Sequence, residues 1–400
     1  MTSVVDTSVK PFTSAMVGAP PVSGVAGSGI AWLDALLVTG FDTKNLTSLV
    51  VAGGVATGSF TGTHSAFVDS VVTIAGSSIA ALNGEQKVTA TAAGVVKFAT
   101  TAADGVASGA ITMKMAPAGW SKVFAGTNKA VYKSNDPAGS GMFLRVDDTA
   151  AQVMRMVGYE AMSDIDTGVG PFPTSAQMNG GGYWAKSVLA SSAAVAWALV
   201  ADSRTLYHAI QAGTSQGATQ TISPVRGFGD PIALRPSGDA YSTFLSYSAN
   251  STPAASVDGC LGNNLFVQAA SPRSYGGLGS GVIHAAQNWG GGGIVNYYSG
   301  MTDIHGAFPN PVDGALYLCK KILVQNGTTN PRSELPGFYA LTQSGTWNTF
   351  KLGDRTPGTG VLAGRTLMAM TSVGSTASMN TVPSALTAGI VMVDVTGPWR

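Results

Sequence analysis

The sequence predicts a mainly β protein: a multi-domain β-sandwich or barrel architecture with a short N-terminal arm and one helix. Short apolar or alternating runs of strand length recur from residue 48 onward, and Gly, Asn or Asp separates them. In the first part of this region the runs follow one another at intervals of roughly 8–12 residues, which is typical of sandwiches and barrels. Helical periodicity is nearly absent after residue 40.

The first 48 residues are predicted to form an N-terminal arm followed by the helix. Residues 17–29 are rich in Pro, Gly and Ser and indicate an extended arm. After it, Ser28 is a candidate N-cap and Gly40 a stop signal. Between them, apolar residues recur on one helical face: Ile30, Trp32, Leu33, Leu36 and Leu37. The helix is short, so we expect it to dock against other elements.

Residues 49–115 are predicted to form a compact all-β module. Short β-type runs fill this segment, and the pairs Asn83-Gly84 and Asp104-Gly105 are expected to form tight turns because these residues tolerate positive φ. If this module is an insertion, the main domain is discontinuous and joins residues 1–48 to residues 116–400.

Residues 116–400 are predicted to form a large β-rich main domain. Two strands are expected around a turn at Asp202-Ser203, and the run 365–373 is expected to pair with the run 389–397. Residues 271–300 contain many glycines and are expected to form an extended loop.

The charge balance excludes some partners and favours others. The chain has 22 Lys and Arg against 21 Asp and Glu, a net charge of +1, and only 11% charged residues, where about 25% is usual. No basic stripe for nucleic acid is present. So few surface charges protect poorly against association. We therefore expect much of the surface to be buried against copies of the same chain or against partners.

The sequence gives no indication of membrane insertion or export. The longest apolar runs, such as residues 193–201, are far shorter than the roughly 18 residues of a spanning helix. No basic and apolar leader is visible at the N-terminus, so synthesis and folding in a cytoplasm are expected. Cys260 and Cys319 lie far apart and form neither a disulfide framework nor a zinc motif.

One motif suggests a nucleophile. Residues 213–217 read Gly-Thr-Ser-Gln-Gly, a GxSxG pattern centred on Ser215. Partners for a triad would come from Asp258 or Asp303 and from His284 or His305. The following residues include Pro224 and many β-branched side chains, so they cannot open the helix that a nucleophile elbow needs. A polar loop is the favoured interpretation, and we expect no enzymatic activity, no catalytic residue and no cofactor.

No metal motif is recognisable. The four histidines are not spaced as ligands: His64, His208, His284 and His305. Asp164 begins a run resembling a calcium loop, but its twelfth position is Ser175, where that loop needs Glu. A looser cation site stays open, built from Asp147, Asp148, Asp164 and Asp166. Carboxylates that stabilise turns are the favoured interpretation.

A group of aromatic residues is the best candidate for a receptor or partner contact. They crowd a glycine-rich stretch with few charges: Tyr275, Trp289, Tyr297, Tyr298 and Phe308. Aromatic rings on loops offer a large contact area at low entropic cost and suit sugar or protein recognition. The alternative, which we favour, is that they pack beneath their own loops.

Nearly the whole chain resembles uncharacterised virion-associated proteins from the tail or structural modules of tailed bacteriophages and prophages. The segments that carry this resemblance are TSVVDTSVKPFTSAM, VVAGGVATGSF, VDSVVTIAG, ALNGEQKVTAT, APAGWSKVFAGTNKAVYKS, MFLRVDDT, VGYEAMSDIDTGVGPFPT, LAGRTLMAM and VDVTGPWR. Residues 49–115 look like the insertion modules that decorate phage tail and capsid proteins.

The resemblance implies a structural protein of the virion, located in the tail at its tip or baseplate, and it supplies no catalytic residues. We expect a symmetric homo-oligomer, a trimer, in contact with other virion tail proteins. Two alternatives stay open within the particle: a receptor-binding tail protein that recognises a host glycan or pilus, and a capsid decoration or head-fibre protein. A third alternative is an esterase or glycan depolymerase.

Overall fold

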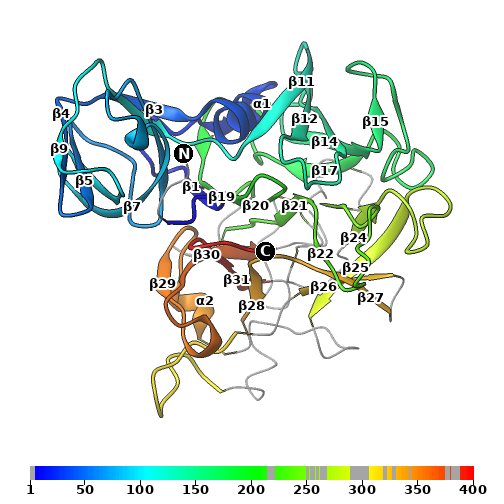
Figure 1. Cartoon of the computed structure of the whole chain (residues 1–400). Helices are drawn as coiled ribbons and strands as arrows, with labels where there is room; N and C mark the ends of the chain where they lie inside the picture. The colour runs from blue at the N-terminus through cyan, green and yellow to red at the C-terminus, as the bar shows by residue number, and fades with distance from the viewer. Residues whose placement is uncertain are drawn as a thin grey trace.

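The computed structural model describes residues 5–213, 221–248, 252, 257, 261, 268–288, 306–318, 322–326, 330–341, 343, 345–373, 379 and 388–400. The part of the chain that the structure describes is mainly β, with 44% of it in strands, which form several sheets, and 6% in helices. The predicted fold class is confirmed. Figure 1 shows the eight-stranded sheet as a blue-to-cyan lobe on one side of the molecule, with the remaining sheets beside it.

The largest sheet has ten strands in the described residues, and all neighbouring strands with a described register are antiparallel. Its order is β1 (Lys10–Thr13), β19 (Trp197–Ala201), β20 (Thr205–Ile210), β21 (Val225–Gly229), β23 (Phe244–Tyr247), β24 (Gln268–Ser271), β25 (Val282–Asn288), β26 (Ile322–Asn326), β27 (Asn330–Glu334) and β22 (Ile232–Ala233). Strands β19 to β21 are buried on both faces, so this part of the sheet lies inside the molecule.

The strands of the ten-stranded sheet test two predictions. The hairpin around Asp202-Ser203 is confirmed, because β19 pairs with β20 and the Asp202 carboxylate accepts the N–H groups of Arg204 and Thr205. The expectation of an extended loop over residues 271–300 is wrong for part of its length, because residues 282–288 form β25. The β-branched pair Val282 and Ile283 carries the strand signal there, and the glycines before it obscured that signal. Residues 289–300 of the predicted loop lie outside the described residues.

The second sheet has eight strands and forms the lobe at one side of Figure 1. Its order is β3 (Phe41–Asn45), β10 (Thr112–Met115), β6 (Val71–Ala75), β7 (Gly84–Ala92), β8 (Val95–Ala99), β5 (Val55–Ser59), β4 (Ser48–Ala52) and β9 (Gly105–Val106). Strand β3 precedes residue 49 and pairs with β10, so the sheet of the small module starts at Phe41.

The remaining sheets are smaller. A five-stranded sheet has the order β11 (Trp120–Gly126), β12 (Lys129–Ser134), β13 (Phe143–Asp147), β14 (Val153–Tyr159) and β17 (Gly182–Ala185). A four-stranded sheet has the order β28 (Phe338–Ala340), β31 (Ala388–Asp394), β30 (Thr366–Val373) and β29 (Arg355–Pro357). Two pairs complete the set: β15 (Ala161–Met162) with β16 (Gly168–Val169), and β2 (Val22–Ser23) with β18 (Ala194–Val195). The predicted pairing of 365–373 with 389–397 is confirmed as β30 with β31.

The N-terminal segment contains the expected helix, in an altered form. Helix α1 (Ser28–Leu33) continues directly into a π-helix, η1 (Asp34–Thr39), and Gly40 ends it as predicted. Ser28 is not the N-cap. Gly27 occupies that position, and the Ser28 hydroxyl donates a hydrogen bond to the Ser23 carbonyl instead. Three further short helices occur in the described residues: η2 (Ala80–Leu82), α2 (Thr346–Thr349) and η4 (Gly360–Leu362).

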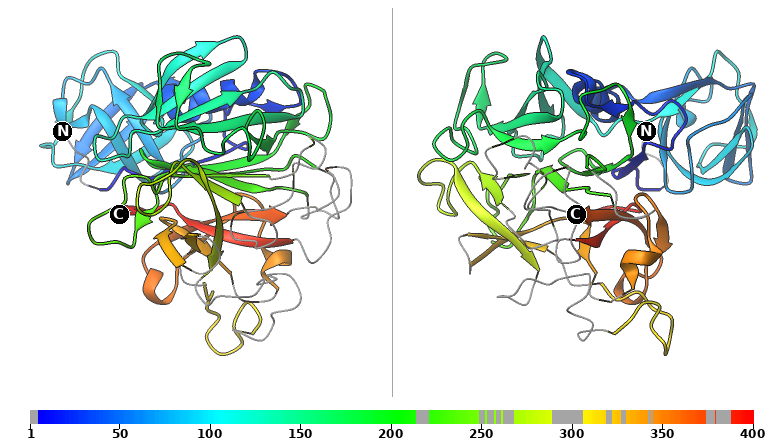
Figure 2. Two further views of the ribbon diagram at one scale, coloured as in Figure 1. Left: turned by 90° about the vertical axis from the view of Figure 1, so that its right-hand side faces the viewer. Right: turned by 180° about the vertical axis from the view of Figure 1, so that it is seen from behind.

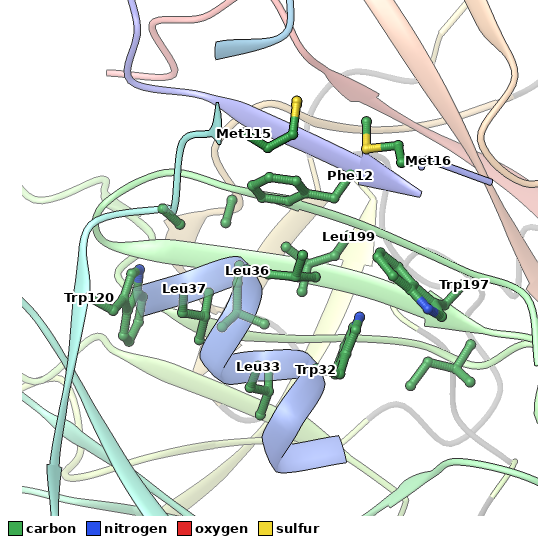
Figure 3. Close-up of a cluster of buried hydrophobic side chains, with 14 of the residues drawn as sticks. Phe12, Met16, Trp32, Leu33, Leu36, Leu37, Met115, Trp120, Trp197 and Leu199 are labelled. Carbon is green, nitrogen blue, oxygen red and sulfur yellow. The ribbon is translucent and has the colours of Figure 1, made fainter. Parts of the chain in front are cut away.

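The helix packs against the ten-stranded sheet, and this contact forms the centre of the main core. Figure 3 shows Trp32 and Leu36 close to Leu199 on β19, with Trp197 beside Trp32. The rings of Trp32 and Trp197 are 5.7 Å apart, edge to face. The apolar face predicted from the sequence is therefore the buried face. Met115 from the small module reaches the same cluster, so the core extends from one lobe into the other.

Polar contacts also attach the small module to the rest of the chain. Lys87 on β7 is 2% exposed, and its Nζ donates to two backbone carbonyls near the C-terminus, those of Val395 and Thr396. Lys10 on β1 pairs with Glu85, and the Thr366 hydroxyl donates to the Asp69 carboxylate. Figure 2 shows this lobe against the C-terminal strands when the molecule is seen from behind.

Neither of the predicted turns closes a hairpin. A helical turn, η2, precedes Asn83, and Gly84 then begins β7. Asp104 precedes the short strand β9, and its carboxylate accepts the Gly53 N–H. The hairpin between β4 and β5 turns at Gly53-Gly54, where both residues have positive φ. Among the described residues, no helix has the length and apolarity needed to cross a bilayer.

Candidate functional site

The loop between β24 and β25 presents an exposed aromatic and aliphatic surface. Tyr275 is 41% exposed and Leu278 is 76% exposed. On the neighbouring segment after β22, Leu234 is also exposed, and the Arg235 guanidinium lies 5.4 Å from the centre of the Tyr275 ring. We call these four residues the Tyr275 surface. They combine apolar area with one cation, which suits contact with a sugar or a protein.

A tight turn holds the loop in shape. The Ser274 hydroxyl and its N–H both donate to the Leu278 carbonyl, and the Gly277 N–H donates to the Ser274 carbonyl. Gly277 has a φ of +73°, and a Cβ there would lie 3.2 Å from the Tyr241 ring. Glycine therefore serves both the turn and the close packing at this position.

A buried ionic network lies under the loop. Arg332 on β27 is fully buried and forms two hydrogen bonds to the Asp239 carboxylate, at 2.7 Å from Nε and 3.1 Å from Nη2. Its Nη1 also donates to the Arg273 carbonyl at 2.7 Å, immediately before the loop. Two-point pairing of this kind fixes geometry as well as charge. The position of the loop is therefore set from inside the protein.

A second cation braces the loop from its outer side. Arg273 forms two hydrogen bonds to the Glu160 carboxylate, at 2.8 and 2.7 Å, and its guanidinium lies 4.7 Å from the centre of the Tyr241 ring. Gly281, at the far end of the loop, accepts a hydrogen bond from the Gln177 side chain. The Tyr275 surface is thus carried by a braced loop, and little ordering remains to be done when it meets a partner.

The aromatic residues singled out in the sequence do not form one described group. Tyr275 lies on the exposed surface just described. Phe308 is half-buried, with its ring 5.4 Å from that of the buried Phe350, which directly follows α2. Trp289, Tyr297 and Tyr298 lie outside the described residues.

The described histidines are separate from one another. His64 faces the Ala92 carbonyl, with 3.0 Å between Nε2 and the oxygen. His208 is buried between two tryptophans, and burial, with a smaller contribution from Arg226, lowers its pKa to about 3. Burial and then Arg332 lower the pKa of His284 to about 4. His305 lies outside the described residues. Within the part of the chain that the structure describes, no three potential ligands are grouped around one point.

The carboxylates considered for a cation site bind other parts of the protein. Asp166 pairs with Arg145 and Lys129, and Asp164 accepts the backbone N–H groups of Asp166 and Thr167. Asp147 accepts the Thr149 hydroxyl, and Asp148 is fully buried beside Lys186. The preferred interpretation, carboxylates that stabilise turns, applies to Asp164 and Asp147, and the open alternative of a shared cation site is wrong.

The candidate nucleophile, the aspartates considered beside it and the two cysteines belong to parts of the chain that the structure does not describe. They are Ser215, Asp258, Asp303, Cys260 and Cys319.

Sequence reasoning missed the buried network under the loop. Arg332 stands in the run NPRSEL between a turn and an apolar residue, and nothing in its spacing distinguishes it from an exposed arginine. Its burial follows from the position of β27 between β26 and β22, which only the fold determines.

In the comparisons with known proteins, no family model matches the chain and no curated protein matches it significantly.

Proposed function

We propose that this chain is a structural component of a tailed-phage virion, located at the tail tip or baseplate, where it assembles as a symmetric oligomer. The resemblance of its sequence segments to tail-module proteins supplies the location. The physical support comes from the surface, whose composition favours coverage by other subunits.

The chain has few charged residues, and several of them are buried, so still fewer lie on its surface. The chain has 22 Lys and Arg and 21 Asp and Glu. Among the described residues nine of these side chains are buried: Lys10, Lys87, Asp148, Lys186, Asp202, Arg226, Arg332, Glu334 and Asp394. Few charges remain to keep chains of this size apart in solution. This is the observation that carries the proposal.

Exposed aliphatic side chains supply the complementary feature. Val361 is 102% exposed, Val312 is 93% exposed, and Val106 on β9 is 72% exposed. These residues lie on different loops and edges. Single exposed apolar residues are common on protein surfaces. In the proposed assembly these three residues are the points that neighbouring subunits would cover.

Mass spectrometry of purified particles tests the proposal. Particles from lysates of the phage or induced prophage that encodes the chain are purified on a density gradient and digested. The chain is expected in the particle band, at a constant ratio to the tail-tube protein over successive gradients. Its absence from purified virions would remove the proposal.

Receptor binding is the second candidate function, and the Tyr275 surface supports it. A braced loop with an exposed aromatic ring, an aliphatic side chain and a neighbouring arginine has the composition of a recognition surface. In this alternative the chain still belongs to the tail, and the loop contacts a host glycan or pilus.

Adsorption measurements separate the two candidates. Tyr275→Ala combined with Leu278→Ser should lower the adsorption rate at least tenfold if the loop grips a receptor, with particle yield unchanged. Leu189→Ser is the matched control, because Leu189 is 60% exposed and lies outside both the Tyr275 surface and the valines assigned to subunit contacts. Equal adsorption rates of the two variants would argue against receptor binding by this loop and leave the structural role as the only candidate.

The proposed role requires no chemistry of its own. Incubation of envelope polymers with the native chain tests for an esterase or depolymerase. Cleavage of the polymer by the native chain that is lost in Ser215→Ala would contradict the proposal. Electron microscopy of labelled particles distinguishes the tail from the capsid, because a decoration protein would label the head.

A further inference from the structure

The strand ends of the five-stranded sheet bring together a lysine and an aspartate in the interior. Asp148 directly follows β13 and Lys186 directly follows β17, the two strands that flank β14. Because both strands run antiparallel to β14, their C-terminal ends lie at the same end of the sheet. Neither side chain has any exposed surface, and Nζ of Lys186 contacts Oδ1 of Asp148.

This pair differs from the other lysine pairs of the described residues. In each of those, at least one partner keeps solvent contact, for example Glu85 with Lys10 and Asp166 with Lys129, whose carboxylates are 35% and 52% exposed. An exposed partner stays solvated by water, and such a pair is an ordinary surface ion pair. Water does not reach the side chains of Asp148 and Lys186.

Backbone groups also form hydrogen bonds with both side chains of the pair. Oδ2 of Asp148 accepts the N–H groups of Gly29 and Ile30, at 2.8 and 3.2 Å. Nζ of Lys186 donates to the Val25 carbonyl at 2.9 Å. The site is also tightly packed, because a Cβ on Gly29 would lie 2.2 Å from the sulfur of Met154.

Enclosure makes the charged form of this pair costly. Each of two ions removed from water loses a large part of its solvation free energy. Burial raises the pKa of Asp148 above its usual range, and the contacts with Lys186 and the two N–H groups oppose this in part. The neutral carboxylic acid form of Asp148 is thereby brought closer in free energy, and this is the form of a carboxyl group that an amine can attack.

We propose that Lys186 and Asp148 become joined by an intramolecular amide bond after the chain folds. The proposal goes beyond the role in the virion and does not depend on it, since the reaction needs only the folded chain.

The reaction is a condensation whose atoms balance without a co-reactant. The ammonium proton passes from Nζ to Oδ1, and the amine lone pair then attacks Cγ. The negative charge develops on Oδ2, where the N–H groups of Gly29 and Ile30 already donate, as in an oxyanion hole. A second proton moves from Nζ to Oδ1, the Cγ–Oδ1 bond breaks, and water leaves. Fixed contact between the two groups replaces a bimolecular encounter.

The product retains the hydrogen bonds of the site. Oδ2 becomes the amide oxygen and continues to accept both N–H groups, while the remaining hydrogen on Nζ donates to the Val25 carbonyl. Two buried charges disappear. The link would join the strands on either side of β14 and fasten the start of α1 to them through Oδ2.

Intact-mass measurement under denaturing conditions tests the proposal on the native chain. The expected mass is lower than the sequence mass by one water molecule. Lys186→Arg, prepared in the same way, is the matched control, because arginine keeps the ion pair and does not condense. After allowance for the substitution, the two masses should differ by that one water, whatever happens at the N-terminus.

A tryptic map gives the position of the bond. The amide blocks cleavage after Lys186, so residues 146–155 should appear covalently joined to residues 156–204 and absent as a free peptide. A native chain with the full sequence mass, or with peptide 187–204 released in full, would overturn the proposal and leave an ordinary buried ion pair. A water loss confined to peptide 146–155 would overturn it equally.

Discussion

His208 makes the stability of the fold sensitive to acid, and its replacement gives the most quantitative prediction. The ring is 1% exposed and lies against Trp184 and Trp32, with centroid distances of 4.3 and 5.4 Å. Neither ring nitrogen has a hydrogen-bond partner among the residues that the structure describes. Burial, and to a lesser degree Arg226, lowers the pKa to about 3 from the ordinary value of 6.5.

The sign of the effect follows from the lowered pKa. Between its ordinary value and about 3, the unfolded chain binds a proton at His208 and the folded chain does not, so stability falls as pH falls. From about pH 7 to about pH 5 this linkage removes about 2 kcal/mol of the free energy of unfolding. His284, with a pKa of about 4, removes about the same amount over that interval.

The variant His208→Phe fills the same aromatic position without a titrating group. At neutral pH it should be as stable as the native chain or about 1 kcal/mol more stable, since two unpartnered polar atoms are removed. Urea unfolding followed by tryptophan fluorescence at the two pH values measures both effects. The variant should lose about 2 kcal/mol less than the native chain on acidification. An equal loss in the two proteins would refute the reasoning.

Two further predictions concern packing and the attachment of the module. Lys87→Met removes the donor to two carbonyls near the C-terminus. It should lower the free energy of unfolding, measured in urea, by about 2–4 kcal/mol. The control Lys97→Met, on the exposed face of β8, should change this free energy little. If both variants unfold at the same urea concentration, Lys87 does not secure the module. Gly158→Ala places a Cβ 2.3 Å from the Phe172 ring and should lower the free energy of unfolding by about 1–3 kcal/mol. Gly105→Ala is the control, because a Cβ there meets nothing within 4 Å. Equal melting temperatures of the two variants would contradict the packing of Gly158 against Phe172.

Local patterns in the sequence were sufficient for the fold class and several elements. The apolar stripe through Trp32 and Leu36 predicted the helix and its buried face, and the two strand-like runs 365–373 and 389–397 predicted β30 and β31. The helix cap was wrong for a physical reason. The N–H groups of Gly29 and Ile30 are satisfied by Asp148, more than a hundred positions later in the chain, so Ser28 is not needed as a local cap.

The candidate site was predictable only in part. Aromatic residues in a glycine-rich stretch drew attention to Tyr275, and its exposure agrees with a contact surface. The same reasoning grouped it with Phe308, which packs on Phe350. The network of Arg332 and Asp239 was beyond prediction, because burial of a charged side chain depends on tertiary partners. Sequence spacing does not record those partners.

The central claim, that this low-charge β surface exists to be covered by sister and neighbouring subunits in a phage tail, is tested most directly by an electron cryo-microscopy map of the particle. The account predicts density for this chain at the tail tip or baseplate, in symmetric copies, with Val312 and Val361 against adjacent subunits. A map in which other proteins account for all tail density would contradict it.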